Sequence, residues 1–310
     1  MNEIKNNTVF EARGLTKRYG KLNALDGVNL TIRKGDIYGF VGENGAGKTT
    51  LIRILAGTAG ISGGSISLFG ADNPAEITAS RRRMSGIIEN PAVYPDLSAT
   101  ENLEIVRLQM GIPGRACIGK SLETVGLTGT GKKKAKNFSL GMKERLGLAM
   151  ALISEPEFLV LDEPTNGLDP VGIVELRELI KKLNTENGIT ILISSHILGE
   201  LYQLATCYGF IHQGKMAEQL SLEQLDEKCK RHLYLAVNDA PKAVTVIETK
   251  LGSNNYEVLP NGVIKLYDFL DDSKKVSNAM FEGGIAVSEI TVKGDDLEQY
   301  YMNLIGGRKV

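Results

Sequence analysis

The stretch Gly42-Glu-Asn-Gly-Ala-Gly-Lys-Thr-Thr50 follows directly on the apolar run Ile37-Tyr-Gly-Phe-Val41. This run is typical of a buried strand, and apolar residues recur at helical spacing from Leu51 to Leu55. A glycine-rich turn between a strand and a helix directs backbone N–H groups at an anion, and the positive end of the helix dipole adds to them. The stretch therefore predicts a phosphate-binding loop.

The side chains of this loop indicate what it binds. The Lys48 ammonium suits the β- and γ-phosphates of a nucleotide, and the Thr49 hydroxyl suits a Mg²⁺ ion. The predicted nucleotide contacts in the loop are Gly42, Asn44, Gly45, Ala46, Gly47, Lys48, Thr49 and Thr50.

A second match to the same pattern, from Gly114 to Ser121, stands in a different context. The segment before it, Asn102 to Met110, is typical of a helix and not of a strand. Bulky residues, among them Arg115 and Ile118, stand where the backbone has to approach the phosphate. We interpret this match as fortuitous.

Length and composition limit the classes to which the chain can belong. Its 310 residues suffice for one large and one smaller domain, and its net charge of −1 gives no support to a nucleic-acid partner. The basic runs 81–83 and 132–134 lack interleaved aromatic residues and are interpreted as solvated surface. Cys117, Cys207 and Cys229 are scattered, which favours a reducing compartment. We find no signal-peptide pattern, and no apolar run reaches the roughly 18 residues of a spanning helix.

Strand-like and helical patterns alternate through the first 220 residues, which predicts an α/β fold with a mostly parallel sheet covered on both faces. Residues 9–13 and 25–32 are expected to pair in an antiparallel layer, and residues from about 91 to 154 are mostly helical. After about residue 220, a β-α-β-β-α-β order predicts a small α+β domain.

A second buried strand ends in two carboxylates, in Phe158-Leu-Val-Leu-Asp-Glu163. If it lies beside the strand of the phosphate-binding loop, Asp162 emerges near the Mg²⁺ ion. Glu163, one residue later, is placed to polarise a water molecule for attack on the γ-phosphate. The pair therefore predicts hydrolysis of the bound nucleotide.

Between these motifs lies Asn137-Phe-Ser-Leu-Gly-Met-Lys-Glu-Arg145, and here the sequence resembles the ABC ATPases, whose signature is L-S-G-G-Q-x-Q-R. Leu140, Met142 and Glu144 depart from that consensus. The resemblance implies a P-loop NTPase cassette over residues 1–220. Such a cassette has a RecA-like core, an antiparallel β layer and a helical signature subdomain, here over about 91–154. Residues 221–310 would form an accessory α+β domain.

The resemblance also implies ATP and Mg²⁺ as cofactors, and a homodimer in the ATP-bound state. Ser139 and Gly141 sit where a helix is expected to begin, which makes a second anion site. In the family, this site closes over ATP held by the phosphate-binding loop of a second chain. Asn166-Gly-Leu-Asp169 resembles the loop that lies across the same dimer interface.

Two more residues take roles from the resemblance. Tyr19 is similar to the aromatic residue that stacks on adenine. His196 follows the expected strand Ile189–Ile193 and is similar to the histidine that contacts the γ-phosphate.

Glu89, in Ile87-Ile-Glu-Asn-Pro91, stands where the family usually carries a glutamine. A carboxylate binds Mg²⁺ more strongly than an amide does, and it places negative charge near the γ-phosphate. The predicted Mg²⁺ ligands are thus Thr49, Asp162 and Glu89, and the predicted catalytic residues are Glu163, His196 and Glu89.

This variant resembles the ATPases of bacitracin and lantibiotic self-protection exporters. The resemblance implies a cytoplasmic ATPase subunit, peripheral on the inner face of the cell membrane, which drives a separate integral membrane permease. Residues 89–103 would dock on that permease, with Tyr94 and Leu97 as candidate contacts. We expect no nucleic-acid partner.

Other functions stay open at this point. Export of a lipid or a drug is the alternative for the substrate. A soluble ABC ATPase of translation or DNA repair is disfavoured, because the chain has one credible phosphate-binding loop and no sustained heptads. A regulatory GTPase would carry an Asn-Lys-x-Asp motif, which the sequence lacks.

Overall fold

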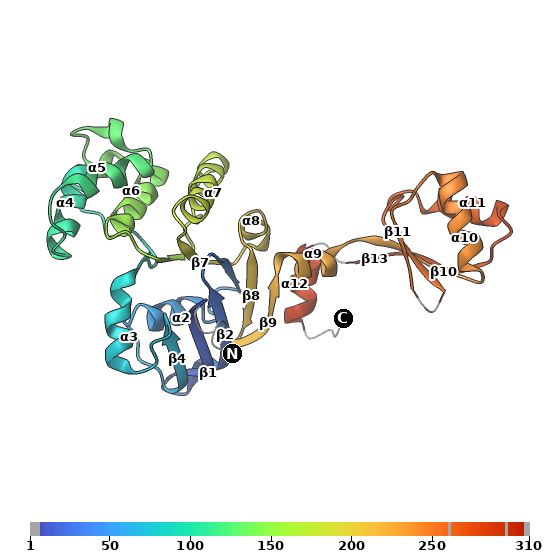
Figure 1. Cartoon of the computed structure of the whole chain (residues 1–310), viewed down its shortest axis with the longest axis horizontal. Coiled ribbons are helices and arrows are strands. Elements are labelled where there is room, and N and C mark those ends of the chain that lie inside the picture. The colour runs from blue at the N-terminus through green and yellow to red at the C-terminus, as the bar shows by residue number, and fades with distance from the viewer. Residues whose placement is uncertain (1–6, 260–261, 295–296, 307–310) are drawn as a thin grey trace. The chain divides into compact units, whose positions relative to one another are not determined.

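The computed structural model describes residues 7–259, 262–294 and 297–306 (Figure 1). The chain falls into two compact units that divide between Leu222 and Glu223. The first unit contains every motif singled out above, and the second contains the small α+β arrangement.

A six-stranded sheet forms the centre of the first unit. Its strand order is β5-β6-β7-β3-β8-β9, and all neighbours are parallel except β8 and β9. The bounds are β3 Ile37–Val41, β5 Met84–Ile87, β6 Phe158–Asp162, β7 Thr190–Ser195, β8 Cys207–His212 and β9 Lys215–Ser221. Every residue of β3, β6 and β7 is buried, as parallel strands covered on both faces require. The predicted α/β class is confirmed.

The register of this sheet brings three chain segments together. Strand β6 does not lie directly beside β3, as the sequence had suggested, because β7 is inserted between them. Asp162 at the end of β6 pairs with Ser194 of β7, and Val41 at the end of β3 pairs with Ser195 of β7. The segments that follow β3, β6 and β7 therefore emerge side by side, at the carboxyl edge where α/β sheets bind ligands.

An antiparallel layer packs against this core. It has the order β2-β1-β4, with bounds β1 Thr8–Tyr19, β2 Leu22–Arg33 and β4 Gly63–Leu68. Helix α2, Lys48–Leu55, contributes Leu51 and Ile52 to the same hydrophobic core as Leu25 of β2 and Phe40 of β3. Because α2 is fixed on its apolar side, its N-terminus is held at the end of β3. The antiparallel strands are longer than expected from the sequence.

The remaining helices of this unit are α3 Pro74–Ser80, α4 Ala99–Gln109, α5 Ala116–Thr124, α6 Leu140–Leu152, α7 Pro170–Thr185 and α8 Leu198–Tyr202. Helices α4, α5 and α6 lie together (Figure 1), and of these α6 also contacts β5 at the edge of the sheet. Gly119, Lys120 and Ser121 lie inside α5, so the second match to the phosphate-loop pattern forms no such loop. Helices α3 and α8 were not anticipated from the sequence.

The basic run 81–83 is not simply solvated surface, as the sequence had suggested. The Arg81 guanidinium donates to the carbonyl oxygens of Ile54 and Leu55, at 3.2 and 2.9 Å. It therefore satisfies the last carbonyls of α2, which have no partner within the helix. Arg83 pairs with Glu157 at 2.7 Å and stacks on the ring of Phe69.

The second unit contains the predicted β-α-β-β-α-β order. Its sheet is antiparallel with the order β11-β12-β10-β13, and the bounds are β10 His232–Val237, β11 Tyr256–Val258, β12 Val263–Leu266 and β13 Val287–Lys293. Its helices are α9 Leu222–Cys229, α10 Ala240–Val246, α11 Ser273–Glu282 and α12 Leu297–Ile305. Leu233, Leu235 and Ile264 pack with Val276 and Met280 in a separate core. The sequence also predicts a final helix over residues 295–304, of which residues 295–296 lie outside the described residues.

Candidate functional site

The loop after β3 has the backbone that its glycines allow. Gly45 and Gly47 have φ angles of 81° and 114°, a region that side chains disfavour. A Cβ at Gly47 would stand 2.6 Å from the carbonyl oxygen of Ala24, so the loop passes too close to β2 for any larger residue. Gly42 and Ala46 are buried, Asn44 is exposed, and Thr50 is half-buried in the first turn of α2.

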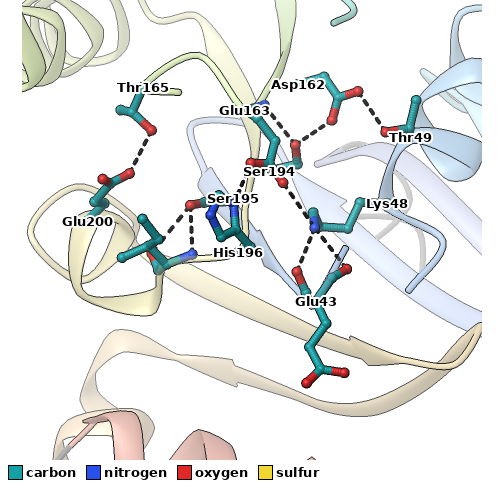
Figure 2. Close-up of polar contacts among 12 residues, drawn as sticks. Glu43, Lys48, Thr49, Asp162, Glu163, Thr165, Ser194, Ser195, His196 and Glu200 are labelled. Carbon is teal, nitrogen blue, oxygen red and sulfur yellow. Dashed lines mark hydrogen bonds and ion pairs between the residues drawn. The ribbon is translucent and has the colours of Figure 1, made fainter. Parts of the chain in front are cut away.

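Lys48 is the charged centre of this loop (Figure 2). Its side chain is 5% exposed, and Nζ donates to the carbonyl oxygens of Gly42 and Glu43 at 2.5 and 3.1 Å. Nζ also lies 3.0 Å from Oε1 of Glu163. A buried ammonium needs such partners, because removing it from water without them is costly. These are the contacts for which a phosphate would compete.

Asp162 joins the loop to the end of β6, which β7 separates from β3 in the sheet. The Thr49 hydroxyl donates to its Oδ2 at 2.9 Å, and the Ser194 hydroxyl donates to its Oδ1 at 2.5 Å. A hydroxyl and a carboxylate are hard oxygen donors of the kind Mg²⁺ prefers, so this pair fits the ion. Over the described ranges, no three His, Cys, Asp or Glu side chains gather as a metal site. Phosphate and water oxygens would have to complete the coordination.

Glu163 lies between the lysine and the histidine. Its Oε2 is 2.5 Å from Nδ1 of His196, while Oε1 contacts Lys48 (Figure 2). Its backbone has a φ angle of 51°, and its N–H donates to the carbonyl and hydroxyl oxygens of Ser194 at 3.2 and 2.9 Å. A side chain with positive φ persists only where its surroundings hold it, and such positions cluster at functional sites.

Glu89 stands outside this network. Its backbone also has a positive φ angle, 66°, but its carboxylate pairs with the Arg53 guanidinium of α2. No contact described for the chain joins Glu89 to Thr49 or Asp162. The structure thus brings Thr49, Asp162, Glu163 and His196 together. Glu89 lies apart from them, in an ion pair with Arg53.

The predicted second anion site lies at the start of α6. Ser139 is the N-cap, and its Oγ accepts from the Met142 N–H at 3.3 Å. The position next to Gly141 is open, since the nearest atom to a Cβ there would be 3.8 Å away. Among the described residues, no hydrogen bond or ion pair joins Ser139 to the loop after β3. Tyr19 ends β1 with 47% of its surface exposed, and the Lys17 ammonium lies 4.8 Å from its ring centre.

Sequence reasoning missed several residues of this site. Ser194 holds both Asp162 and Glu163, and the hydroxyl of Thr165 donates to Oε2 of Glu200 at 2.6 Å (Figure 2). The available signal for Ser194 was a polar pair, Ser194-Ser195, at the end of an apolar run. Nothing in the sequence joined Thr165 to Glu200, because the two lie 35 residues apart.

Glu144 of α6 stands where the ABC consensus has glutamine. Its carboxyl group is expected to make the stability of the fold depend on pH. It is 8% exposed, and burial raises the pKa of its carboxyl from 4.5 to about 7. The folded chain therefore keeps a proton there that the unfolded chain releases above its own lower pKa. Stability consequently falls as the pH rises from about 4.5 to about 7.

We expect Glu144→Gln to raise the thermal unfolding temperature at pH 8 by roughly 2–4 °C, because a neutral amide costs less to bury than a carboxylate. At pH 5 the variant and the parent chain should unfold at nearly the same temperature. Circular dichroism at both pH values measures this. Glu123→Gln, on the exposed side of α5, serves as the control. An equal shift at both pH values would contradict the assignment.

Comparison with known proteins places these observations in context. A family model described as "ABC transporter" matches residues 25–166. The bacitracin transport ATP-binding protein BcrA of Bacillus licheniformis is 45% identical over 97% of this chain and 98% of its own length. The lantibiotic transport ATP-binding protein SrtF of Streptococcus pyogenes is 45% identical over 67% of this chain and 89% of its own. Among solved structures, cbiO1 from Clostridium perfringens, part of the ABC transporter complex cbiONQ, gives a TM-score of 0.66 at 26% identity. That match covers 72% of this chain and 92% of cbiO1.

Proposed function

Because this chain belongs to the family of ABC transporter ATP-binding proteins, whose cassettes bind and hydrolyse ATP, we propose that it powers the export of a peptide antibiotic, or immunity to one. The similarity to proteins named for bacitracin and lantibiotic transport supports this substrate class. The alignment covers nearly the whole length of both this chain and BcrA, so the sequence similarity extends over the second unit.

The single observation that carries the chemistry is Glu163 held between Lys48 and His196. In the proposed cycle, the γ-phosphate competes for the Lys48 ammonium, which releases Glu163 to accept a proton from the attacking water. His196 keeps the carboxylate oriented and faces the same phosphate. Mg²⁺, when bound at Thr49 and Asp162, would neutralise charge on the phosphates.

The proposed ATP-bound state is a homodimer. Ser139 and Gly141 lie at the free N-terminus of α6, where the helix dipole and an unhindered backbone favour an anion. Since they make no described contact with the phosphate loop of their own chain, a second chain is the proposed source of the ATP that they contact.

A separate membrane subunit is the proposed partner. No helix within the described ranges has the length and apolar character needed to cross a bilayer. A groove of about 720 Å³ lies between α4 and α5, lined by Leu97, Ile105, Ile118 and Leu122, with Glu101 and Glu104 beside them. We propose that an apolar segment of the membrane subunit docks here and at the exposed Tyr94. The chain would then sit on the inner face of the cell membrane, and its second unit would regulate or extend this docking.

Antibiotic survival tests the proposed function. A strain lacking the chain should become more sensitive to bacitracin or to a lantibiotic, and the wild-type chain should restore resistance, whereas Glu163→Gln should not. Unchanged sensitivity to both antibiotics would favour a lipid or drug substrate. Copurification with ribosomes, in place of an integral membrane protein, would favour the soluble class.

The role of Glu89 gives a separate prediction. Glu89 pairs with Arg53 in this structure, so its proposed role as a Mg²⁺ ligand requires that its carboxylate leave Arg53 when nucleotide binds. We expect Glu89→Gln to leave ATP binding intact and to raise the Mg²⁺ concentration for half-maximal ATPase activity by about threefold, because an amide is the weaker ligand. A Mg²⁺ titration of fluorescent-nucleotide binding should shift in the same direction. Glu76→Gln on α3 is the matched surface control. Identical Mg²⁺ curves for Glu89→Gln and the wild-type chain would remove Glu89 from the metal site.

A further inference from the structure

A hydrogen bond beyond the reacting groups joins the two segments that carry them. The segment after β6 contains Glu163 and, two residues later, Thr165. The segment after β7 contains His196 and, four residues later, Glu200 in α8. The Thr165 hydroxyl donates to Oε2 of Glu200 at 2.6 Å, so the segments are tied a second time beyond the Glu163–His196 contact (Figure 2).

The Thr165–Glu200 hydrogen bond lies close to a backbone position of unfavourable conformation. Glu163 has a φ angle of 51°, a conformation that an L-residue keeps only when neighbouring contacts enforce it. On one side its N–H is held by Ser194. C-terminal to Glu163, the chain enters a turn. Thr165 is the first residue there whose side chain has a described hydrogen bond to another segment.

The same bond also fixes the turn that follows. The N–H of Asn166 donates to the Glu163 carbonyl at 3.1 Å, and the N–H of Leu168 donates to the Thr165 carbonyl at 3.1 Å. The turn 166–169 is therefore built on the backbone of Glu163 and Thr165. A shift of Thr165 would move both the turn and the glutamate.

Both partners are half-buried, so the bond is not a weak surface contact. Thr165 and Glu200 line a small pocket together with apolar side chains. These are Ile173 and Leu176 of α7 and Leu201 of α8. A carboxylate beside apolar side chains is held in one orientation more firmly than an exposed carboxylate. In any other orientation it would lose its hydrogen-bond donor.

We propose that Thr165 and Glu200 act together as a positioning pair that holds Glu163 in register with His196 and with the turn 166–169. Neither residue has a described contact with the loop after β3, and the pair acts through the glutamate. This inference rests on the proposed role of Glu163 as the group that activates water.

The prediction is a loss of turnover without a loss of binding. Thr165→Val keeps the shape of the side chain and removes the hydroxyl, and we expect it to lower kcat for ATP about tenfold, because a small misplacement of a reacting group is costly. The affinity for a fluorescent ATP analogue and the thermal unfolding temperature should stay close to those of the wild-type chain. Thr165→Ser, which restores a hydroxyl, should recover most of the lost turnover.

A double-mutant cycle decides whether the two residues act as one unit. Glu200→Ala should lower kcat by a similar factor, and the variant with both changes should lose no more than either single variant. Thr185→Val in α7 removes a hydroxyl that bonds only within its own helix, and serves as the control. Wild-type kcat in Thr165→Val, losses that multiply in the double variant, or a parallel loss of nucleotide binding would each overturn the proposal. Failure of the proposed function would show differently, as absent ATPase activity in the wild-type chain or normal activity in Glu163→Gln.

Discussion

Glu163→Gln is expected to abolish ATP turnover, with kcat lowered by at least about 100-fold, the usual contribution of a general base. A glutamine keeps the size of the side chain but cannot accept a proton at neutral pH. Nucleotide binding should persist, because Lys48, Thr49 and Asp162 are unchanged. Removing a negative charge beside the γ-phosphate should also favour the ATP-bound dimer.

Three measurements check this expectation. Steady-state phosphate release gives kcat, fluorescent-nucleotide binding gives affinity, and gel filtration with ATP reports the dimer. Glu155→Gln is the matched control, because this glutamate pairs with Lys120 on the surface. Turnover within a few-fold of the wild-type chain would remove Glu163 from the water-activating role. Loss of nucleotide binding would show that its contact with Lys48 is needed to shape the loop.

Lys48→Met is expected to have the second large effect, a fall in ATP affinity of at least about 100-fold, or about 2.7 kcal/mol. The ammonium is buried and aimed into the loop, where a phosphate would meet it with little intervening water. The variant also leaves the Glu163 carboxylate without its cation, so phosphate entry meets an unbalanced negative charge.

The chain itself provides a sharp control for this experiment. Lys120 occupies the equivalent place in the second match to the phosphate-loop pattern, but lies inside α5 and pairs with Glu155. Lys120→Met should therefore bind ATP like the wild-type chain, as isothermal titration calorimetry can measure. Equal losses in the two variants would point to a general effect of charge and not to a phosphate site in the loop after β3.

Much of the site was predictable because its chemistry is local in sequence. The strand, the glycine turn and the helix around Lys48 are contiguous, and the glycines at positive φ are required by the backbone itself. Asp162 could be placed near Thr49 because two apolar runs predict strands of one parallel sheet, whose carboxyl ends meet at one edge. The expectation that the two strands are direct neighbours is wrong, because β7 lies between β6 and β3. The structure has the two side chains 2.9 Å apart.

Other features could not be predicted, since they depend on contacts between distant segments. Helix α8 has only five residues, too few for a periodic pattern to reveal it. Glu89 was predicted as a Mg²⁺ ligand from its chemistry, and its pairing with Arg53 follows from how α2 and the end of β5 lie. The role of Arg81 at the end of α2 likewise needed the fold, because a basic run by itself is typical of solvated surface.

Short contiguous runs of residues predict the phosphate-binding loop, the strand that leads into Asp162 and Glu163, and the family resemblance, because the backbone conformation or burial of each run depends on its own residues. Which side chains meet across those runs depends on how the whole chain folds. Strand order placed Ser194 against the Asp162 carboxylate and the Glu163 backbone N–H, and the path of the chain beyond β6 and β7 brought Thr165 to Glu200. Such contacts follow from the packing of the whole sheet, and no local pattern records them.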